Sequence, residues 1–530
     1  MNPEIQAESQ VQTNPAADLF KFRREMGTIS RQSAVFFAGT MFTTAAGYLF
    51  KLFVARKLGA ELLGVYALGM TVVGLLGVFA ALGLPSAASR FVAVYTGTGK
   101  TDLLRGLLGR STLFLLIVSS ILAAVAVLGS HWISVDLYHT PELARYMPLF
   151  GLLLVTGVMG GFCGQVLAGY KDVTRRTVIT NFIGSPLMMV LALALILAGT
   201  GLSGYIAAQV ASAVITLFLL AAVVWKSTPP AARYPLTHLP HLEKEVVHFS
   251  AALFGISVLE FLLSQADKIL LGVFLNARQV GIYAVAISLV AFVPIALQTV
   301  NQIFAPVIAD LYARGERVLI GRLFQTLTKW ILGLTIPLAL VMVVYAHVLM
   351  RLFGRDFEAG WPILVIGTFG QLVNCGVGSV NQLLLMSGEQ RRLIKIQIVM
   401  ATIAVALNAA LIPWFGIMGA AAAGTMVNIA NNLWSLAVVR RVLGVSPHDR
   451  SYFALVFPSA ASALCIVLLH HWGAGALPGL LLLFLALCMG YIVFIGGSLL
   501  FGLNEDDRLV VGAIWYQVRQ FLVRPRVNAG

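Results

Sequence analysis

Long apolar stretches are the feature of this chain that most limits its fold. Windows of about 20 apolar residues recur roughly fourteen times along its 530 residues. Charged residues make up only 11% of the sequence, where a soluble protein carries about 25%. A helix of this length spans the hydrocarbon core of a bilayer and satisfies its own backbone hydrogen bonds. The sequence therefore predicts an all-α, polytopic membrane bundle. The predicted spans are 32–54, 63–88, 107–129, 147–169, 177–199, 203–225, 248–274, 282–308, 326–350, 361–386, 394–414, 417–439, 452–470 and 476–501.

The distribution of basic residues supports this number of spans. With both termini in the cytoplasm, 28 of the 36 Lys and Arg residues fall in cytoplasmic segments, as the positive-inside rule expects. Removing one span would reverse the alternation of basic loops from that point on. The net charge of +14 is thus explained by topology and by contact with anionic lipids, and nucleic acid is not expected as a partner. The polar N-terminus lacks a cleavage pattern, so the first span is expected to be retained.

An internal repeat divides the chain. Residues 48–68, YLFKLFVARKLGAELLGVYAL, align without a gap with residues 265–285, QADKILLGVFLNARQVGIYAV. In each copy an apolar helix is expected to end in a short turn and to restart at Gly-(Val/Ile)-Tyr-Ala. The offset of 217 residues pairs Lys51 with Lys268, Gly64 with Gly281, and Tyr66 with Tyr283. A looser echo relates Gly201-x-x-Gly204 to Gly416-x-x-Gly419.

The repeat predicts two similar lobes. Because the offset covers six spans, an even number, both copies enter the membrane from the same side, as parallel repeats about an axis along the membrane normal. We therefore expect two six-helix lobes related by a pseudo-two-fold repeat, followed by two extra C-terminal helices. The predicted divisions are a cytoplasmic tail (1–30), the N-lobe (31–226), a cytoplasmic linker (227–247), the C-lobe (248–440), the last two spans (441–503) and a cytoplasmic tail (504–530).

Several classes of function are not expected. All loops are short, which argues against a membrane glycosyltransferase or polymerase with a catalytic loop. The four cysteines lie in apolar segments without the spacing of a metal site, and the His241–His248 segment lacks a zinc motif. No phosphate-binding loop is present, so ATP hydrolysis is not expected. The sequence predicts a transporter rather than an enzyme, with no cofactor and no metal.

Ionisable residues on the seventh span are candidates for a transport site. Glu260, Asp267 and Lys268 share one helical face, and each costs roughly 2.5–3.5 kcal/mol at the centre of a span. One interpretation is a polar wall of a cavity between the lobes, with Glu260 or Asp267 as the ion-coupling group and Lys268 as an anion contact. The alternative is that Asp267 and Lys268 pair or reach the membrane surface. Lys51 has the same two interpretations, and its recurrence as Lys268 favours a role in transport.

Arg90 and a set of amides are further candidates. Arg90 follows Gly83-Leu84-Pro85 at the cytoplasmic end of the second span, where it would meet a phosphate headgroup or act as an ordinary anchor. Amides on three spans would bind sugar hydroxyls or hold helices together. The amides chosen as substrate-binding candidates are Gln298, Asn301, Gln371, Asn374 and Asn381. Further amides in these spans are Gln302, Gln382, Asn428, Asn431 and Asn432.

Three stretches carry a family resemblance. LGAELLGVYALGMTVVGLLGVFAALGLPSAASRFVA (58–93), ADKILLGVFLNARQVGIYAVAISL (266–289) and NAALIPWFGIMGAAAAG (408–424) resemble bacterial polysaccharide-transport proteins, the Wzx-like oligosaccharide flippases. These belong to the multidrug/oligosaccharidyl-lipid/polysaccharide exporter superfamily. The resemblance implies a two-lobed bundle that moves polyprenyl-pyrophosphate-linked sugar units to the outer leaflet by alternating access. It makes Lys51, Arg90 and Lys268 the candidates for contact with pyrophosphate and sugars.

The resemblance also sets the alternatives. Lipid II flippases carry an Arg-rich first helix, from which GTMFTTAAGYLFKLF (39–53) departs. A cation-coupled exporter of small molecules or drugs is the other alternative. The expected location is the bacterial cytoplasmic (inner) membrane. The expected partners are a lipid-linked oligosaccharide, membrane lipids and the polymerase or assembly proteins of O-antigen (lipopolysaccharide), capsule or exopolysaccharide biosynthesis. A monomer is favoured, although the sequence leaves the oligomeric state open.

Overall fold

The computed structural model describes residues 15–233, 240–448, 450–473 and 478–500, and all its regular elements are helical. The whole of the predicted C-terminal tail, and parts of the N-terminal tail and the linker, lie outside these residues. The helices of the first half are α1 (Pro15–Ala81), α2 (Leu84–Gly97), α3 (Thr101–Leu128), α4 (Glu142–Gly169), α5 (Val173–Thr177), α6 (Ser185–Leu197), α7 (Gly201–Ser227), α8 (Pro230–Arg233) and α9 (Lys244–Phe274). Those of the second half are α10 (Ala277–Val290), α11 (Ile295–Ala313), α12 (Arg317–Val344), α13 (Ala346–Phe353), α14 (Trp361–Val377), α15 (Val380–Met386), α16 (Gln390–Leu443), α17 (Val456–Gly473) and α18 (Gly479–Leu500). Four short π or 3-10 segments are η1 (Trp132–Leu137), η2 (Val178–Gly184), η3 (Arg355–Gly360) and η4 (Arg450–Leu455).

The predicted membrane bundle is confirmed. Among the described residues, 11 helices are long and apolar enough to cross a bilayer, and α10 with the first part of α11 forms a further, bent candidate. Two of the long helices are each divided by a glycine with non-helical backbone angles, Gly59 in α1 and Gly416 in α16. With these two breaks and the bent pair, the helices cover all fourteen predicted spans. Large apolar side chains such as Phe484 (64% exposed) face outward, as expected for a lipid-facing surface.

Several predicted spans are not single straight helices, and the breaks in two of them lie beside the site described below. The span predicted at 282–308 bends by 54° between α10 and α11, where Pro294 has no backbone N–H to continue the helix. The span predicted at 361–386 is divided at Gly378, which has φ 78°. A side chain at Gly378 would collide with Thr328, so both its backbone angle and its surroundings require glycine. A hydropathy window does not detect either break.

Both copies of the repeat contain the expected turn, but it lies earlier than predicted. The first copy breaks at Gly59, and the second breaks at Asn276, which caps α10 by accepting a hydrogen bond from the backbone N–H of Gln279 (3.0 Å). These two positions are related by the 217-residue offset. The predicted restart at Gly64 and Gly281 is therefore wrong, because both of these glycines lie inside helices that begin about one turn earlier.

Gly64 and Gly281 instead form a reciprocal contact between the two copies. A Cβ added to Gly64 would meet the carbonyl of Ala277, and a Cβ added to Gly281 would meet the carbonyl of Ala60. Ala60 and Ala277 are themselves related by the 217-residue offset. The contact is therefore two-fold symmetric, and each helix approaches its mate through the backbone. We call these four residues the glycine crossing.

The looser echo is also visible in the local geometry. Gly201 (φ 61°) and Gly416 (φ 56°) both adopt left-handed backbone angles at a helix break. The glycine three residues later lies tightly against the preceding segment in each case, Gly204 against Thr200 and Gly419 against the carbonyl of Leu411. In both Gly-x-x-Gly motifs, the first glycine permits the left-handed backbone angle and the second permits the close contact.

The helices group into two compact units. The first contains residues 1–51, 76–127 and 148–254, and the second contains residues 52–75, 128–147 and 255–530. In the first unit, α6 packs along α7, and Cys163, Leu167, Ile179 and Leu220 form a buried cluster. The lobe boundaries predicted from the sequence stay a prediction.

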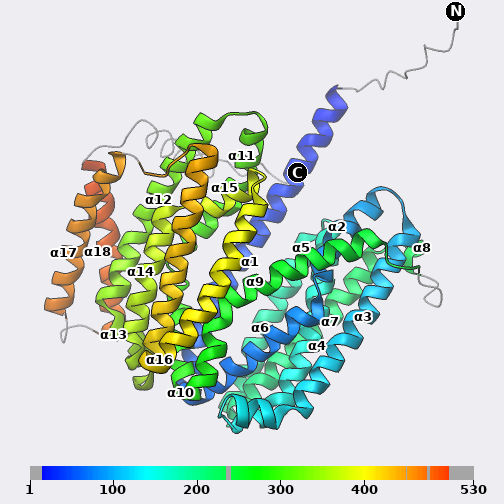
Figure 1. The fold of residues 1–530 in the computed structure, drawn as a ribbon, viewed down its shortest axis with the longest axis horizontal. Helices are drawn as coiled ribbons and strands as arrows, with labels where there is room; N and C mark the ends of the chain where they lie inside the picture. The colour runs from blue at the N-terminus through cyan, green and yellow to red at the C-terminus, as the bar shows by residue number, and fades with distance from the viewer. Residues whose placement is uncertain (1–14, 234–239, 449, 474–477, 501–530) are drawn as a thin grey trace, which may run out of the picture. The chain divides into compact units, whose positions relative to one another are not determined.

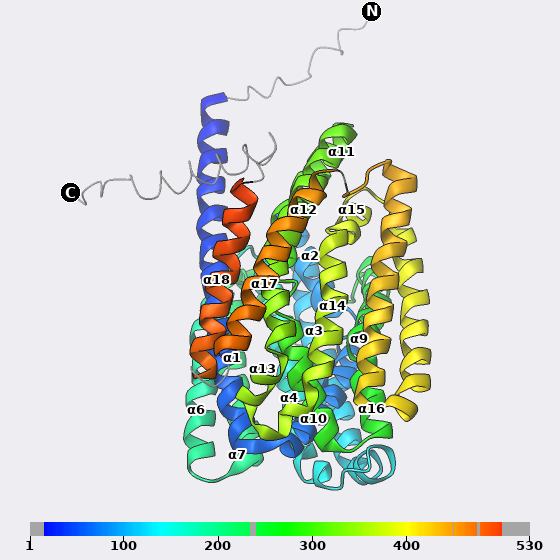
Figure 2. The same ribbon diagram turned by 90° about the vertical axis from the view of Figure 1, so that its left-hand side faces the viewer.

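The second unit holds the larger core and the two C-terminal helices. α14 packs against α12 and α16, and α15 packs against α16. α17 and α18 lie side by side and both contact α12 (Figures 1 and 2). The side chains of Val341, Tyr345, Ile466 and Leu482 are buried where these three helices meet. The two C-terminal helices α17 and α18 are thus attached to the rest of the second unit through α12.

Candidate functional site

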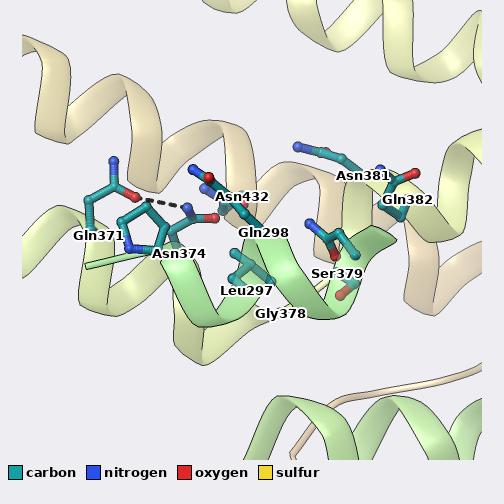
Figure 3. Close-up of a pocket in the computed structure, with 11 residues that line it drawn as sticks. Leu297, Gln298, Gln371, Asn374, Gly378, Ser379, Asn381, Gln382 and Asn432 are labelled. Carbon is teal, nitrogen blue, oxygen red and sulfur yellow. Dashed lines mark hydrogen bonds between the residues drawn. The ribbon is translucent and has the colours of Figure 1, made fainter. Parts of the chain in front are cut away.

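A pocket lined by amides lies in the second unit (Figure 3). Its volume is about 280 Å³. The side chains come from four helices: α11, α14, α15 and α16. The lining residues are Pro294, Leu297, Gln298, Asn301, Gln371, Asn374, Gly378, Ser379, Asn381, Gln382 and Asn432. All five amides that the sequence singled out as substrate-binding candidates therefore line one pocket.

The break at Gly378 determines how this pocket is built. Gln371 and Asn374 come from α14, before the break, and Asn381 and Gln382 come from α15, after it. The sequence predicted one continuous span over 361–386 that carries all four amides. The interruption redirects the chain, yet the amides from both sides of it still line the same pocket.

Some pocket amides bind each other. The Nδ2 of Asn374 donates to the Oε1 of Gln371 at 2.9 Å, which is the dashed line in Figure 3. The Nδ2 of Asn432, a side chain only 3% exposed, donates to the backbone and side-chain oxygens of Asn428 at 2.9 and 3.0 Å. Asn428 in turn donates to the backbone oxygen of Gly370 on α14 (3.2 Å). In the twelfth span, Asn428 therefore holds two helices together, which is the second of the two interpretations given for the amides.

Other pocket amides have buried oxygens that no protein group satisfies. The side-chain oxygens of Asn301, Asn381 and Gln382 are inaccessible to solvent and have no hydrogen-bond partner among the described residues. A buried polar atom without a partner costs about 1–3 kcal/mol. Because these oxygens have no solvent-accessible surface here, they would reach a ligand or an ordered water in the pocket only after rotation of their side chains.

The pocket lining is uncharged, and a buried cluster packs on the same helices. The lining residues include no Asp, Glu, Lys, Arg or His. Phe304, Phe324 and Leu383 belong to the buried cluster, which joins α11, α12, α14, α15 and α16. Val300 packs against this cluster from the same helix as Asn301. Well-packed supporting side chains keep polar groups in fixed positions for binding.

The ionisable candidates on α9 have partners nearby. Asp267 accepts a hydrogen bond from the hydroxyl of Tyr283 (2.6 Å), a fully buried residue on α10. The Nζ of Lys268 donates to the Oε1 of Gln265 at 2.8 Å. Glu260 is exposed. Asp267 thus secures the turn of the second repeat. Ion coupling by Glu260 or Asp267, and substrate contact by Lys268, stay predictions.

Arg90 lies in a contact between α2 and the start of α9. Its guanidinium carbon is 4.5 Å from the ring centre of Phe249, and a guanidinium nitrogen is 3.7 Å from the Oε1 of Glu245. Close by, the hydroxyl of Tyr95 donates to Glu243 at 2.5 Å. Burial and the Glu243 carboxylate raise the pKa of Tyr95 well above its ordinary value. These contacts attach the end of the linker to α2, and the phosphate role of Arg90 stays a prediction.

Lys51 is half-buried at the end of the first unit's α1 segment, whereas Lys268 belongs to the second unit. Their predicted shared cavity is untested. Three pocket residues with polar side chains were not among the site candidates: Ser379, Gln382 and Asn432. The signal for them was present, because all three lie in the amide-rich tenth and twelfth spans. What the sequence lacked was the direction in which each amide points.

Comparisons with known proteins identify the family and the fold. The family model described as "Polysaccharide biosynthesis protein" matches residues 29–312, which is more than half of the chain. This match confirms the resemblance seen in the sequence. The MatE family model matches residues 252–410. A search of curated proteins gives no match.

Several solved structures share the fold. The lipid II flippase MurJ in an inward closed conformation superposes with a TM-score of 0.67 at 14% identity, covering 88% of this chain and 98% of that chain. An inward-facing multidrug resistance MATE transporter of the MOP superfamily gives 0.56 at 16% identity, with coverages of 75% and 94%. The Vibrio cholerae MATE transporter VcmN, as a point mutant, gives 0.54 at 18% identity, with coverages of 81% and 100%. The fold is thus that of a multi-pass membrane transporter.

Proposed function

We propose that this chain, which belongs to the polysaccharide biosynthesis protein family, is a flippase for a lipid-linked oligosaccharide. It would move a polyprenyl-pyrophosphate-linked glycan from the inner to the outer leaflet of the bacterial cytoplasmic membrane, by alternating access and without ATP hydrolysis. The product would enter O-antigen, capsule or exopolysaccharide assembly. Both termini would be cytoplasmic, consistent with the alternation of basic loops.

The observation that carries this proposal is the amide-lined pocket. A glycan is rich in hydroxyl groups, and amide side chains both donate to and accept from hydroxyls. Seven amides converge in a pocket built from membrane-spanning helices, where unsatisfied polar groups are costly. Helix packing alone accounts for Asn428, but it does not require seven amide residues around one open volume.

The remaining candidates fit other parts of the cargo. Lys51, Arg90 and Lys268 carry the positive charge that a pyrophosphate needs. Glu260 and Asp267 are the candidates for coupling to an ion gradient. The partners of this flippase would be the lipid-linked oligosaccharide, membrane lipids and the polymerase or assembly proteins of the same polysaccharide.

A cation-coupled exporter of small molecules is the second candidate. The MatE model match over residues 252–410 favours it. Drug-sized ligands usually bind in pockets lined mainly by apolar and aromatic side chains. The amide pocket offers only Pro294 and Leu297 as sizeable apolar groups and no aromatic ring, so it suits a glycan better. The similarity to MurJ leaves lipid II, also a glycan on a lipid pyrophosphate, as an alternative cargo.

A transport assay separates these functions. The purified chain is reconstituted into proteoliposomes that contain a fluorescent polyprenyl-pyrophosphoryl oligosaccharide, and the outer-leaflet fraction is followed by chemical quenching. We expect equilibration between leaflets much faster than in protein-free vesicles. Absence of flipping, together with efflux of a cationic dye driven by a proton or sodium gradient, would overturn the proposal. Faster flipping of lipid II than of the oligosaccharide would reassign the cargo.

A further inference from the structure

We infer that the amide pocket binds one uncharged sugar residue of the transported glycan and discriminates against acidic sugars. This inference rests on the proposed function and adds to it the part of the cargo that this pocket recognises. Two parts of the substrate would then bind at different places. The pocket would bind a sugar ring, and the charged pyrophosphate would bind outside the pocket.

The first argument is the set of amides that line the pocket. Seven amide side chains from α11, α14, α15 and α16 surround one volume. Asn381 and Gln382 are adjacent on α15, and Asn301 comes from α11 (Figure 3 shows the α15 pair). A sugar ring carries several hydroxyl groups around its edge, and each amide can donate to one hydroxyl and accept from another. The side-chain oxygens of these three residues are buried without a partner among the described residues, so they would gain a hydrogen bond when their side chains rotate towards the sugar.

The second argument is charge. The pocket lining contains neither a basic nor an acidic residue. A uronate or phosphate group would enter without a counter-charge, and a metal cation or a drug cation would find no carboxylate. A charge buried in low dielectric is strongly disfavoured unless it is paired. An uncharged, hydroxyl-rich ligand is the class that meets no such penalty.

The third argument is size. A volume of about 280 Å³ lies just below the range of about 300–1,000 Å³ that holds drug-sized ligands. One sugar ring with its hydroxyls suits this space, and a chain of several rings does not. The pocket thus binds a single sugar unit, and the rest of the glycan lies outside it.

The test uses two carriers that share the same polyprenyl pyrophosphate and differ only in one sugar, a neutral hexose or the corresponding uronic acid. Flipping of each is measured in proteoliposomes of the full chain. We expect the neutral carrier to flip at least tenfold faster. Asn301→Leu should slow the neutral carrier about five- to tenfold, since one hydrogen bond to the sugar is lost. The matched control is Gln302→Leu, the next residue on α11, which is exposed and does not line the pocket.

A second variant keeps the test decisive if Asn301→Leu does not fold. Asn381→Lys places a positive charge in the pocket and should shift the preference towards the uronic acid carrier. Binding of the free neutral oligosaccharide, measured by saturation-transfer NMR on the detergent-solubilised chain, should weaken in both pocket variants and not in Gln302→Leu. Equal flipping of both carriers by the wild type, unaffected by these variants, would overturn the inference and leave the flippase intact. No flipping of either carrier would instead refute the proposed function.

Discussion

The glycine crossing predicts a large and specific sensitivity to the smallest side chain. In Gly64→Ala, the new Cβ would lie less than 2 Å from the carbonyl oxygen of Ala277, and ordinary contact begins at 3.4 Å. The two helices would have to move apart by at least about 1.4 Å. Because the obstacle is backbone, no rotamer change relieves the clash. Overpacking of this kind costs about 1–3 kcal/mol, and we expect the upper end, about 3 kcal/mol of the free energy of unfolding.

The symmetry of the contact makes a second prediction for the paired variant. Gly281→Ala meets the carbonyl of Ala60 in the same way, so it should cost about as much as Gly64→Ala. Movement of one helix pair relieves both clashes, because both arise at one crossing. The double variant should therefore cost less than the sum of the single variants, by about 0.5–3 kcal/mol.

The measurement is the apparent melting temperature in detergent, together with the yield of monodisperse protein. The matched control is Gly424→Ala in α16, where an added Cβ meets nothing within 4 Å and the backbone is helical. This control should be unchanged or more stable, by up to about 1 kcal/mol, because Ala favours a helix over Gly. A Gly64→Ala protein as stable as the control would refute the close approach, and strictly additive single variants would refute the shared crossing.

Other predictions concern the pocket, the loops and the repeat. Gly378→Ala should distort the α14–α15 break through its positive φ and reduce flipping more than tenfold, measured in proteoliposomes with melting temperature as the folding control. Burial and the nearby charge of Arg440 lower the pKa of His448, so the unfolded chain binds a proton before the folded one does. Stability should therefore fall as pH drops below about 6.5, and His448→Gln should flatten this part of the melting-temperature profile. Lys51→Ala and Lys268→Ala should each impair flipping and leave membrane insertion intact, and normal transport by both would favour a surface-anchoring role for these lysines.

Hydropathy was sufficient for the helices but not for their breaks. Apolar composition is a property of a window of about 20 residues, so it identified the spans. The left-handed angle at Gly378 and the bend before Pro294 are properties of single residues in a tertiary setting. Gly64 and Gly281 were interpreted as restart points because glycine often interrupts a helix. In the structure they permit close backbone approach, which requires a partner in the other copy of the repeat, Ala277 for Gly64 and Ala60 for Gly281.

The site was partly predictable for a similar reason. Residue type identified the amides, since polar groups in apolar spans need partners. The sequence did not show that Asn428 is used in helix packing while Asn381 faces an open volume. The sequence left Asp267 either as a cavity group or as a partner of Lys268, and its hydrogen bond to Tyr283 on the next helix depends on how the turn at Asn276 folds back.

The glycine crossing has a consequence for the origin of the chain. An isologous interface is one in which a surface patch meets an identical copy of itself. Ala60 against Gly281 and Ala277 against Gly64 satisfy this condition across the repeat. A chain of half the length, carrying one copy of the repeat, would present the same patch and would associate as a homodimer through it. Within the single chain the same contact joins one copy of the repeat to the other.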